Sequence, residues 1–225
     1  MAAKRKVQIA PSILSADLGR LAEEIQAAEK AGGDLIHIDV MDGRFVPNIT
    51  WGPPIVEAAR SATTLPLDVH LMIEKPEAYI DAFAKAGADW ITVHLEACPH
   101  VHRALQQVKQ AGDALGREIL AGLAINPGTS ISAIDEIILY ADVLLLMTVN
   151  PGFGAQTFIP TMYDKILLAR SGIDKLGLKT LIEIDGGVSE KNAPKIIASG
   201  ADVLVAGNGV FKARDYKKAI KALRG

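Results

Sequence analysis

The stretch "AGGDLIHI", residues 31–38, carries the pattern that decides the fold. A small residue and a glycine suited to end a helix come first, an aspartate follows at the turn, and then an apolar strand begins. The same order returns in "AGADWITV" at 86–93 and in "SGADVLVA" at 199–206. The chain therefore repeats one kind of helix-to-strand joint, which predicts units that are arranged alike.

Apolar strand candidates alternate with amphipathic helical stretches along the chain. This alternation predicts a parallel sheet of the α/β class. Eight repeats fit a closed (β/α)8 TIM barrel, whose typical size is about 250 residues. We therefore predict a single barrel domain over residues 1–225, with an open doubly wound sheet as the alternative. The strand candidates are residues 7–14, 34–40, 66–72, 89–95, 118–125, 142–149, 180–185 and 202–207.

Composition narrows the classes of function. Hydrophobic residues make up 49% of the chain and charged residues 22%, so a sizeable core is expected. The formal net charge of −2 gives no general attraction to nucleic acid or to a membrane surface. The chain has one cysteine and no long apolar segment near its start, so we expect a reducing, cytoplasmic setting.

Ionisable residues occupy one face of three predicted strands. Side chains alternate between the two faces of a strand, and both faces are buried in a parallel barrel. Apolar residues such as Ile36 and Ile38 then face the helices, while polar residues face the barrel interior near the carboxyl ends of the strands. Active sites of barrels lie at that end. The predicted inward residues are Leu35, His37, Asp39, Met41, Asp68, His70, Met72, Glu183 and Asp185.

Four of these residues suggest a metal site. His37, Asp39, His70 and Asp185 combine two imidazoles with two carboxylates. Such a set suits one divalent ion per chain, with zinc favoured and iron, manganese or cobalt as alternatives. The competing interpretation is a hydrogen-bonded network of ordinary core residues. Four such groups at one end of three strands favour the metal.

Glycine-rich loops follow the last three predicted strands. They read "NPGFGAQ" at 150–156, "DGGV" at 185–188 and "AGNGVF" at 206–211. Loops after strands seven and eight are a recurrent phosphate site in barrels, and glycine lets backbone N–H groups approach an anion. Plain turns are the alternative for any single loop. None of the three continues into GxGxxG, so dinucleotide binding is not expected.

The segment "HLEACPHVH", residues 94–102, gathers three histidines, a glutamate and the cysteine. Its spacing fits neither a tetrahedral zinc site nor one face of a strand, because Pro99 interrupts it. We interpret it as a solvated loop that leads into a helix, with Cys98 as a free thiol.

Taken together, eight stretches resemble the ribulose-phosphate 3-epimerase family along essentially the whole chain. They are "PSILSAD", "HIDVMDGRFVPN", "DVHLMI", "ITVHLEA", "AGLAINPGT", "VNPGFGAQTFI", "EIDGGV" and "AGNGVF". The resemblance implies a barrel enzyme that interconverts ribulose 5-phosphate and xylulose 5-phosphate by inverting carbon 3. It further implies a small phosphorylated ketose as substrate and a homo-oligomer as the assembly.

The resemblance also assigns roles to residues. Asp39 and Asp185 would act as acid and base on opposite faces of carbon 3 while binding the ion together with His37 and His70. Three inward methionines would line the pocket, although core filling is their commoner role. The implied substrate-binding set is Ser12, Met41, His70, Met72, Met147, Gly152, Phe153, Gly154, Ala155, Gly186, Gly187, Gly207 and Asn208.

Two departures from the family pattern lie at the phosphate end. Ala155 stands where the family usually has glycine, and Asn208-Gly209 stands where it usually has Ser-Ala. They leave open an epimerase of a hexulose 6-phosphate such as allulose 6-phosphate. A metal-dependent hydrolase on the same barrel would carry His-x-His on the first strand, which has no histidine. A non-catalytic sugar-phosphate binder would lack one of the two aspartates.

Overall fold

Eight parallel strands form one sheet in the computed structural model, which describes residues 7–225. Each strand is short and runs beside its neighbour in the chain. The strands are β1 (Gln8–Pro11), β2 (Ile36–Met41), β3 (Leu67–Met72), β4 (Trp90–His94), β5 (Leu120–Ile125), β6 (Val143–Met147), β7 (Leu181–Asp185) and β8 (Val203–Ala206).

The sheet closes on itself. Strand β1 pairs with β8 along its length, and a parallel bridge between Ser12 and His37 joins the end of β1 to β2. The predicted (β/α)8 TIM barrel is therefore confirmed and the open doubly wound sheet is excluded. The span of the single domain stays a prediction, since residues 1–6 lie outside the described residues.

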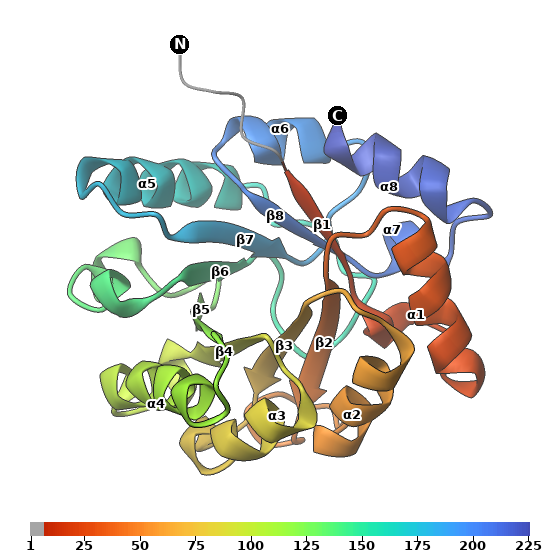
Figure 1. Cartoon of the computed structure of the whole chain (residues 1–225). Coiled ribbons are helices and arrows are strands. Elements are labelled where there is room, and N and C mark those ends of the chain that lie inside the picture. Colours follow the sequence, from red (N-terminus) through yellow and green to blue (C-terminus); the bar gives the residue numbers. More distant parts are fainter. Residues whose placement is uncertain (1–6) are drawn as a thin grey trace.

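Helices surround the strands (Figure 1). Among residues 7–225, no helix is both long enough and apolar enough to cross a bilayer. The α-helices are α1 (Leu21–Lys30), α2 (Pro53–Ala62), α3 (Ile80–Ala86), α4 (Val101–Ala114), α5 (Met162–Lys175), α6 (Ala193–Ala198), α7 (Asn208–Phe211) and α8 (Tyr216–Arg224).

A helical stretch is predicted after every strand, and the segment after β5 is not an α-helix. It forms two 3-10 turns, η5 (Ile131–Ile134) and η6 (Ile138–Tyr140). Ile131, Ile134 and Ile137 are spaced by three residues, which is the period of a 3-10 helix. Ile134 and Ile137 are buried, so this spacing still covers the barrel wall with apolar side chains.

The core has two parts, as strand alternation predicts. Ile36, Ile38 and Val40 of β2 pack in the large cluster that includes the helix residues Val56 and Phe83. Inside the barrel, a separate apolar cluster lies below the polar residues. It comprises Ala10, Leu35, Trp90, Val143, Val203 and Val205. The inward orientation predicted for alternate strand residues is thus confirmed.

The predicted joint between helix and strand has a defined structure. Gly32, Gly87 and Gly200 all adopt positive φ, and the aspartate two residues later lies just before the next strand. Each aspartate makes two bonds to one residue of the preceding strand: its N–H donates to the carbonyl, and its carboxylate accepts from the N–H. A fourth such aspartate, Asp142, was not recognised in the sequence. The pairs are Asp34 with Ile9, Asp89 with Leu67, Asp142 with Ala121 and Asp202 with Ile182, at 2.8–2.9 Å.

At least one basic side chain pairs with each of these aspartates, from a neighbouring helix or, for Arg117, from the segment after α4. The partners are Arg224 for Asp34, Arg60 and Arg117 for Asp89, Lys109 for Asp142, and Arg170 for Asp202. We call the four groups the aspartate clasps. They lie at the amino ends of the strands, which is the end of the barrel opposite the carboxyl-end residues considered next.

Candidate active site

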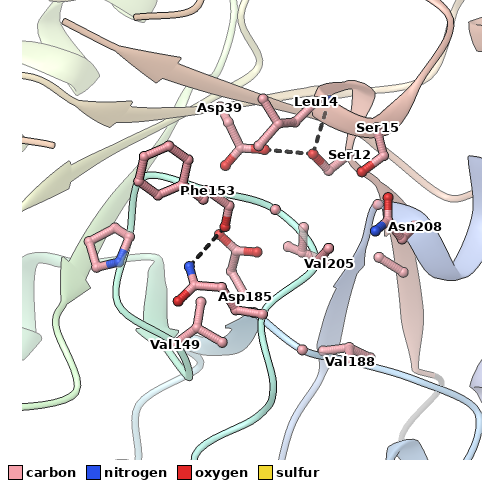
Figure 2. Close-up of a pocket in the computed structure, with 18 of the residues that line it drawn as sticks. Ser12, Leu14, Ser15, Asp39, Val149, Phe153, Asp185, Val188, Val205 and Asn208 are labelled. Carbon is pink, nitrogen blue, oxygen red and sulfur yellow. Dashed lines mark hydrogen bonds between the residues drawn. The ribbon is translucent and has the colours of Figure 1, made fainter. Parts of the chain in front are cut away.

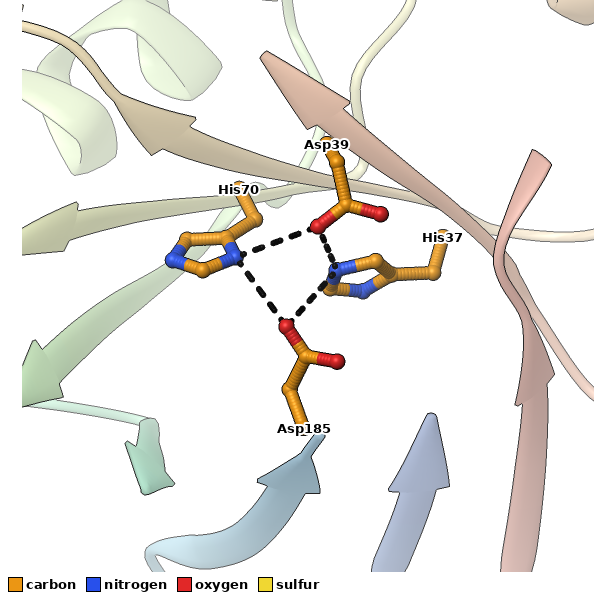
Figure 3. Close-up of side chains that lie close together, drawn as sticks. All are labelled: His37, Asp39, His70 and Asp185. Atoms are coloured by element: carbon orange, nitrogen blue, oxygen red, sulfur yellow. Dashed lines mark ion pairs between the residues drawn. The ribbon is translucent and has the colours of Figure 1, made fainter. Parts of the chain in front are cut away.

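Four ionisable side chains meet at the carboxyl ends of β2, β3 and β7 (Figure 3). Asp39 and His70 are register partners on adjacent strands, and Asp185 ends β7 across the barrel. Nε2 of His37 lies 3.4 Å from Oδ1 of Asp39 and 4.0 Å from Oδ2 of Asp185. Nδ1 of His70 lies 3.7 Å and 3.6 Å from the same two oxygens. One ligand atom from each residue lies within 4.8 Å of all the others.

The two imidazole nitrogens that face these carboxylates have no hydrogen-bond partner among the described residues. They are Nε2 of His37 and Nδ1 of His70, and both side chains are fully buried. A buried polar atom without a partner costs free energy, so its retention calls for a ligand. Two imidazole nitrogens and two carboxylate oxygens around one point fit a divalent cation.

The carboxylates and imidazoles shift one another's pKa. Burial alone would lower the pKa of His37, but the Asp68 and Asp39 carboxylates raise it well above its usual value. Burial would raise the pKa of Asp39, but His37 and His70 lower it. Burial would lower the pKa of His70, but the neighbouring Asp185 and Asp39 carboxylates raise it. The opposite charges of these neighbouring groups therefore outweigh the cost of burying His37, Asp39 and His70.

A second layer of buried acids orients His37. Oδ2 of Asp68 lies 2.5 Å from Nδ1 of His37, and Oε1 of Glu183 lies 3.6 Å from the same nitrogen. Burial and the neighbouring Asp68 raise the pKa of Glu183 well above its usual value. A carboxylate that accepts from one imidazole nitrogen leaves the other free to bind a metal. Sequence reasoning placed Asp68 and Glu183 inside the barrel but gave them no part in the site.

The interpretation of residues 94–102 as a solvated loop is wrong at its first residue. His94 is the last residue of β4 and is fully buried. Its Nε2 lies 2.9 Å from Nε2 of His70, and its Nδ1 lies 3.1 Å from Oε2 of Glu96. Burial lowers the pKa of His94 to about 4. The strand predicted over residues 89–95 already contained His94, and β4 places this imidazole inside the barrel as its last residue.

The remainder of that segment follows the prediction more closely. Residues 99 and 100 are exposed and precede helix α4. Cys98 is a free thiol, as expected, but it is buried. Burial would raise the pKa of Glu96, yet hydrogen bonds from His94, Thr129 and the Asn126 N–H lower it to about 2. No second metal group forms from these residues within the part of the chain that the structure describes.

A cavity of about 350 Å³ opens above the four residues (Figure 2). Asp39 and Asp185 reach its wall, while His37 and His70 do not line it. All other residues of the predicted substrate-binding set line the cavity, including the three methionines. Lining residues that sequence reasoning did not select include Leu14, Ser15, Val149, Pro151, Gln156, Val188, Ser189 and Val205.

Ser12 fixes one oxygen of Asp39. Its hydroxyl donates to Oδ2 of Asp39 at 2.5 Å and accepts from the N–H of Leu14 at 3.3 Å. The predicted first strand, residues 7–14, is therefore too long: β1 ends at Pro11, and a 3-10 turn from Ile13 to Ser15 follows. Ser12 caps this turn, which places its hydroxyl at the cavity wall.

The three glycine loops all line the cavity. Gly187 has a φ of +67°, and a side chain there would lie 2.4 Å from the backbone nitrogen of Phe158. The loop after β7 therefore packs directly against the loop after β6. Ala155 adopts a φ of 60°, a left-handed conformation that favours glycine. The exposed Phe153 ring lies over the cavity (Figure 2).

Comparison with known proteins gives one consistent result. The sequence model of the family described as "Ribulose-phosphate 3 epimerase family" matches residues 8–211. A ribulose-phosphate 3-epimerase from Bacillus subtilis is 54% identical over 97% of this chain and 99% of its own length. A ribulose-5-phosphate-3-epimerase from Arabidopsis thaliana, named as chloroplastic, is 49% identical over 98% of this chain and 77% of its own length.

Among solved structures, KGPDC from Streptococcus mutans has a TM-score of 0.70 and 15% sequence identity. The superposition covers 98% of this chain and 96% of that one. At this identity the likeness shows the barrel fold alone.

Proposed function

The chain belongs to the ribulose-phosphate 3-epimerase family, and we propose that it interconverts D-ribulose 5-phosphate and D-xylulose 5-phosphate by inverting carbon 3. It is an isomerase that acts on carbohydrate phosphates. The observation that carries the mechanism is the pair Asp39 and Asp185, which come from strands on different sides of the barrel and reach the wall of one cavity.

The two aspartates divide the proton transfer between them. The hydrogen at carbon 3 is acidified by the ketone at carbon 2, so a carboxylate can remove it and leave an enediolate. Inversion requires that the proton return from the opposite face. Asp39 serves one face and Asp185 the other, and each acts as acid in one direction and base in the reverse. The hydrogen bond from Ser12 holds Oδ2 of Asp39 and leaves Oδ1 toward the cluster.

His37, Asp39, His70 and Asp185 are the residues that would hold a divalent ion, one per chain. Zinc suits this mixed set best, with iron, manganese and cobalt as alternatives. When bound, the ion would stabilise the negative charge that develops on the substrate's oxygens. The unpartnered imidazole nitrogens of the cluster support this assignment.

The remaining lining residues hold and shield the substrate. Met41, Met72 and Met147 are almost fully buried beside the carboxylates, where a thioether neither donates nor removes a proton. Backbone N–H groups of the glycine loops and the Asn208 side chain would bind the phosphate group. These contacts would position carbon 3 between the two aspartates.

The second candidate is an epimerase of a hexulose 6-phosphate. Ala155 and Asn208, which depart from the usual family pattern, favour it because both line the phosphate side of the cavity. Against a hydrolase, the described β1 strand carries no histidine. A homo-oligomeric assembly and a cytoplasmic location remain predictions.

A coupled assay on both ketose phosphates, run beside elemental analysis, tests the proposal. We expect epimerisation of ribulose 5-phosphate with a higher kcat/KM than of allulose 6-phosphate, and about one divalent ion per chain. A preference for the hexulose would replace the first substrate by the second. Full activity in protein stripped of metal by a strong chelator would remove the ion from the proposal.

A further inference from the structure

A chain of hydrogen-bonding groups leads away from His70 to the edge of the barrel. Nε2 of His70 meets Nε2 of His94 at 2.9 Å, and Nδ1 of His94 meets Oε2 of Glu96 at 3.1 Å. The two rings stack with centroids 5.0 Å apart. Both imidazoles are fully buried, while the Glu96 side chain is 24% exposed. Nothing in the proposed proton transfer uses His94 or Glu96.

The hydrogen bonds of Glu96 fix which atoms carry the protons along the series Glu96, His94 and His70. Oε1 of Glu96 accepts from the backbone N–H of Asn126 at 2.8 Å and from the Thr129 hydroxyl. A backbone N–H can only donate, so this oxygen is held as an acceptor. A glutamate carboxylate is ionised at neutral pH, so the other oxygen, Oε2, is also an acceptor and takes Nδ1–H of His94. A neutral His94 ring with its proton on Nδ1 presents a bare Nε2 to His70.

The His70 end requires the same direction. Only one proton fits between two Nε2 atoms 2.9 Å apart, and the bare nitrogen of His94 must accept it. His70 then carries its proton on Nε2, so its Nδ1 offers a lone pair to the point shared with Asp39 and Asp185. This is the nitrogen that has no partner among the described residues.

We propose that Glu96 and His94 are positioning residues that hold His70 in the tautomer required for metal binding. The inference rests on the metal site of the proposed function. It assigns to His70 the kind of support that Asp68 gives directly to His37, except that here it passes through a second imidazole. Hydrogen-bond partners of this kind typically change metal affinity by about 10- to 100-fold when they are replaced.

Replacing Glu96 by glutamine should reverse the chain without changing its shape. The amide oxygen of Glu96→Gln stays with the Asn126 N–H, because that donor needs an acceptor. The amide NH2 group then faces Nδ1 of His94, which must become the acceptor and move its proton to Nε2. That proton opposes the Nε2–H of His70. We expect zinc affinity to fall by about 10- to 100-fold, as measured by competition with a chromophoric chelator.

Glu77→Gln is the matched control. Glu77 is a partly buried carboxylate of the same region, where it accepts from the Cys98 thiol. Its side chain makes no hydrogen bond or ion pair with His70 or His94. Its replacement removes the same charge and should leave zinc affinity within about twofold of the wild type. A similar loss in both variants would mean that the net charge matters and would overturn the proposal.

Nitrogen NMR of the zinc-loaded proteins reads the tautomers directly. In the wild type, protons should lie on Nε2 of His70 and Nδ1 of His94; in Glu96→Gln, the His94 proton should move to Nε2. A His94→Gln background provides a further check, because Glu96→Gln should there have no additional effect on affinity. The proposal is overturned if Glu96→Gln leaves either the His94 tautomer or the zinc affinity unchanged. It is also overturned if Glu96→Gln lowers zinc affinity as much in the His94→Gln background as in the wild type.

The same titrations separate this inference from the proposed function. If the wild-type protein fails to bind zinc or another divalent ion, the metal site itself is wrong. If the wild type binds zinc and Glu96→Gln binds it equally well, the metal site stands and only the roles of Glu96 and His94 fall.

Discussion

At the scale of single residues, the burial of Asp39 has a chemical reason. Its side chain is only 6% exposed and is held by Ser12 and by the two histidines. A carboxylate kept from bulk water meets the carbon-bound hydrogen without a competing hydration shell. Asp185 is 15% exposed and reaches the same cavity from β7. The two proposed bases therefore differ in burial and in hydrogen-bond support but line one cavity.

Replacing either aspartate should stop net inversion. Asp39→Asn and Asp185→Asn keep the side-chain shape but remove the base, so turnover should fall by at least about a hundredfold. Each variant retains one carboxylate on one face of carbon 3. In heavy water, one variant should exchange the carbon 3 hydrogen of one epimer and the other variant that of the other epimer, with little product from either.

Metal content must be measured in each variant before the loss is attributed to proton transfer, since both aspartates belong to the proposed ion site. Metal-loaded variants that exchange the hydrogen of the same epimer, or one that inverts carbon 3 at the native rate, would contradict the two-base mechanism.

The residues that face the barrel interior could be read from the sequence, but their pairing could not. Strand periodicity placed His37, Asp39, His70 and Asp185 inside, because alternation is a local property. The contact between His70 and His94 depends on how far β4 continues and on the position of Glu96 after it. Those quantities arise from strand register and loop geometry, which the period of two does not contain.

At the scale of elements, the loops after β6, β7 and β8 line the cavity, and we propose that they bind the phosphate. Asn48, in the loop after β2, donates from its side chain to the carbonyl of Gly152 at 3.0 Å, so the loop after β6 is tied to the opposite side of the barrel. Gly187 packs against Phe158 with no room for a side chain. These contacts make the loops a connected frame.

Ribulose without its phosphate should therefore be a poor substrate. Two hydrogen bonds to a charged group are worth about 3 kcal/mol, which corresponds to a loss of about a hundredfold or more in kcat/KM. The measurement is kcat/KM for ribulose and for ribulose 5-phosphate on one preparation. Gly187→Ala should displace the frame and raise the KM for the phosphorylated substrate while changing the rate with ribulose little.

Equal efficiency with and without phosphate, or an equal effect of Gly187→Ala on both substrates, would show that these loops do not bind the phosphate.

Element boundaries were predictable where one pattern dominated. The glycines at 32, 87 and 200 correctly predicted helix ends, because positive φ excludes most other residues. The segment after β5 was less certain, since isoleucines spaced by three satisfy a 3-10 turn and approximate a helical stripe. Strand β1 was predicted too long because apolar composition continued through a turn that Ser12 caps.

At the scale of the whole molecule, function and stability occupy opposite ends of the barrel. The aspartate clasps lie just before the strands, at their amino ends, whereas the candidate active site lies where the strands end. Asp89 pairs with Arg60 and Arg117, whose side chains are 31% and 32% exposed. Asp142 pairs with Lys109, which is 49% exposed. The clasps should therefore differ in strength although their backbone bonds are alike.

Asp89→Asn should destabilise the protein more than Asp142→Asn. Both variants keep an oxygen that can accept from the strand N–H, so they differ mainly in the ion pairs that they lose. We expect losses of about 1–3 kcal/mol for the first and below about 1 kcal/mol for the second. Urea unfolding midpoints measure the order, and kcat should stay unchanged in both. Equal losses, or a larger loss at Asp142, would contradict this ranking.

The four clasps follow a regular order. Each joins an odd-numbered strand to the even-numbered strand that follows it, β1 to β2, β3 to β4, β5 to β6 and β7 to β8. The barrel is thus assembled from four modules of two strands, each secured by its own aspartate. Modules that close internally can be exchanged as units, so grafts between related barrels should tolerate crossovers between modules better than crossovers within them. Repeated duplication of one ancestral segment of two strands would produce the same regular order.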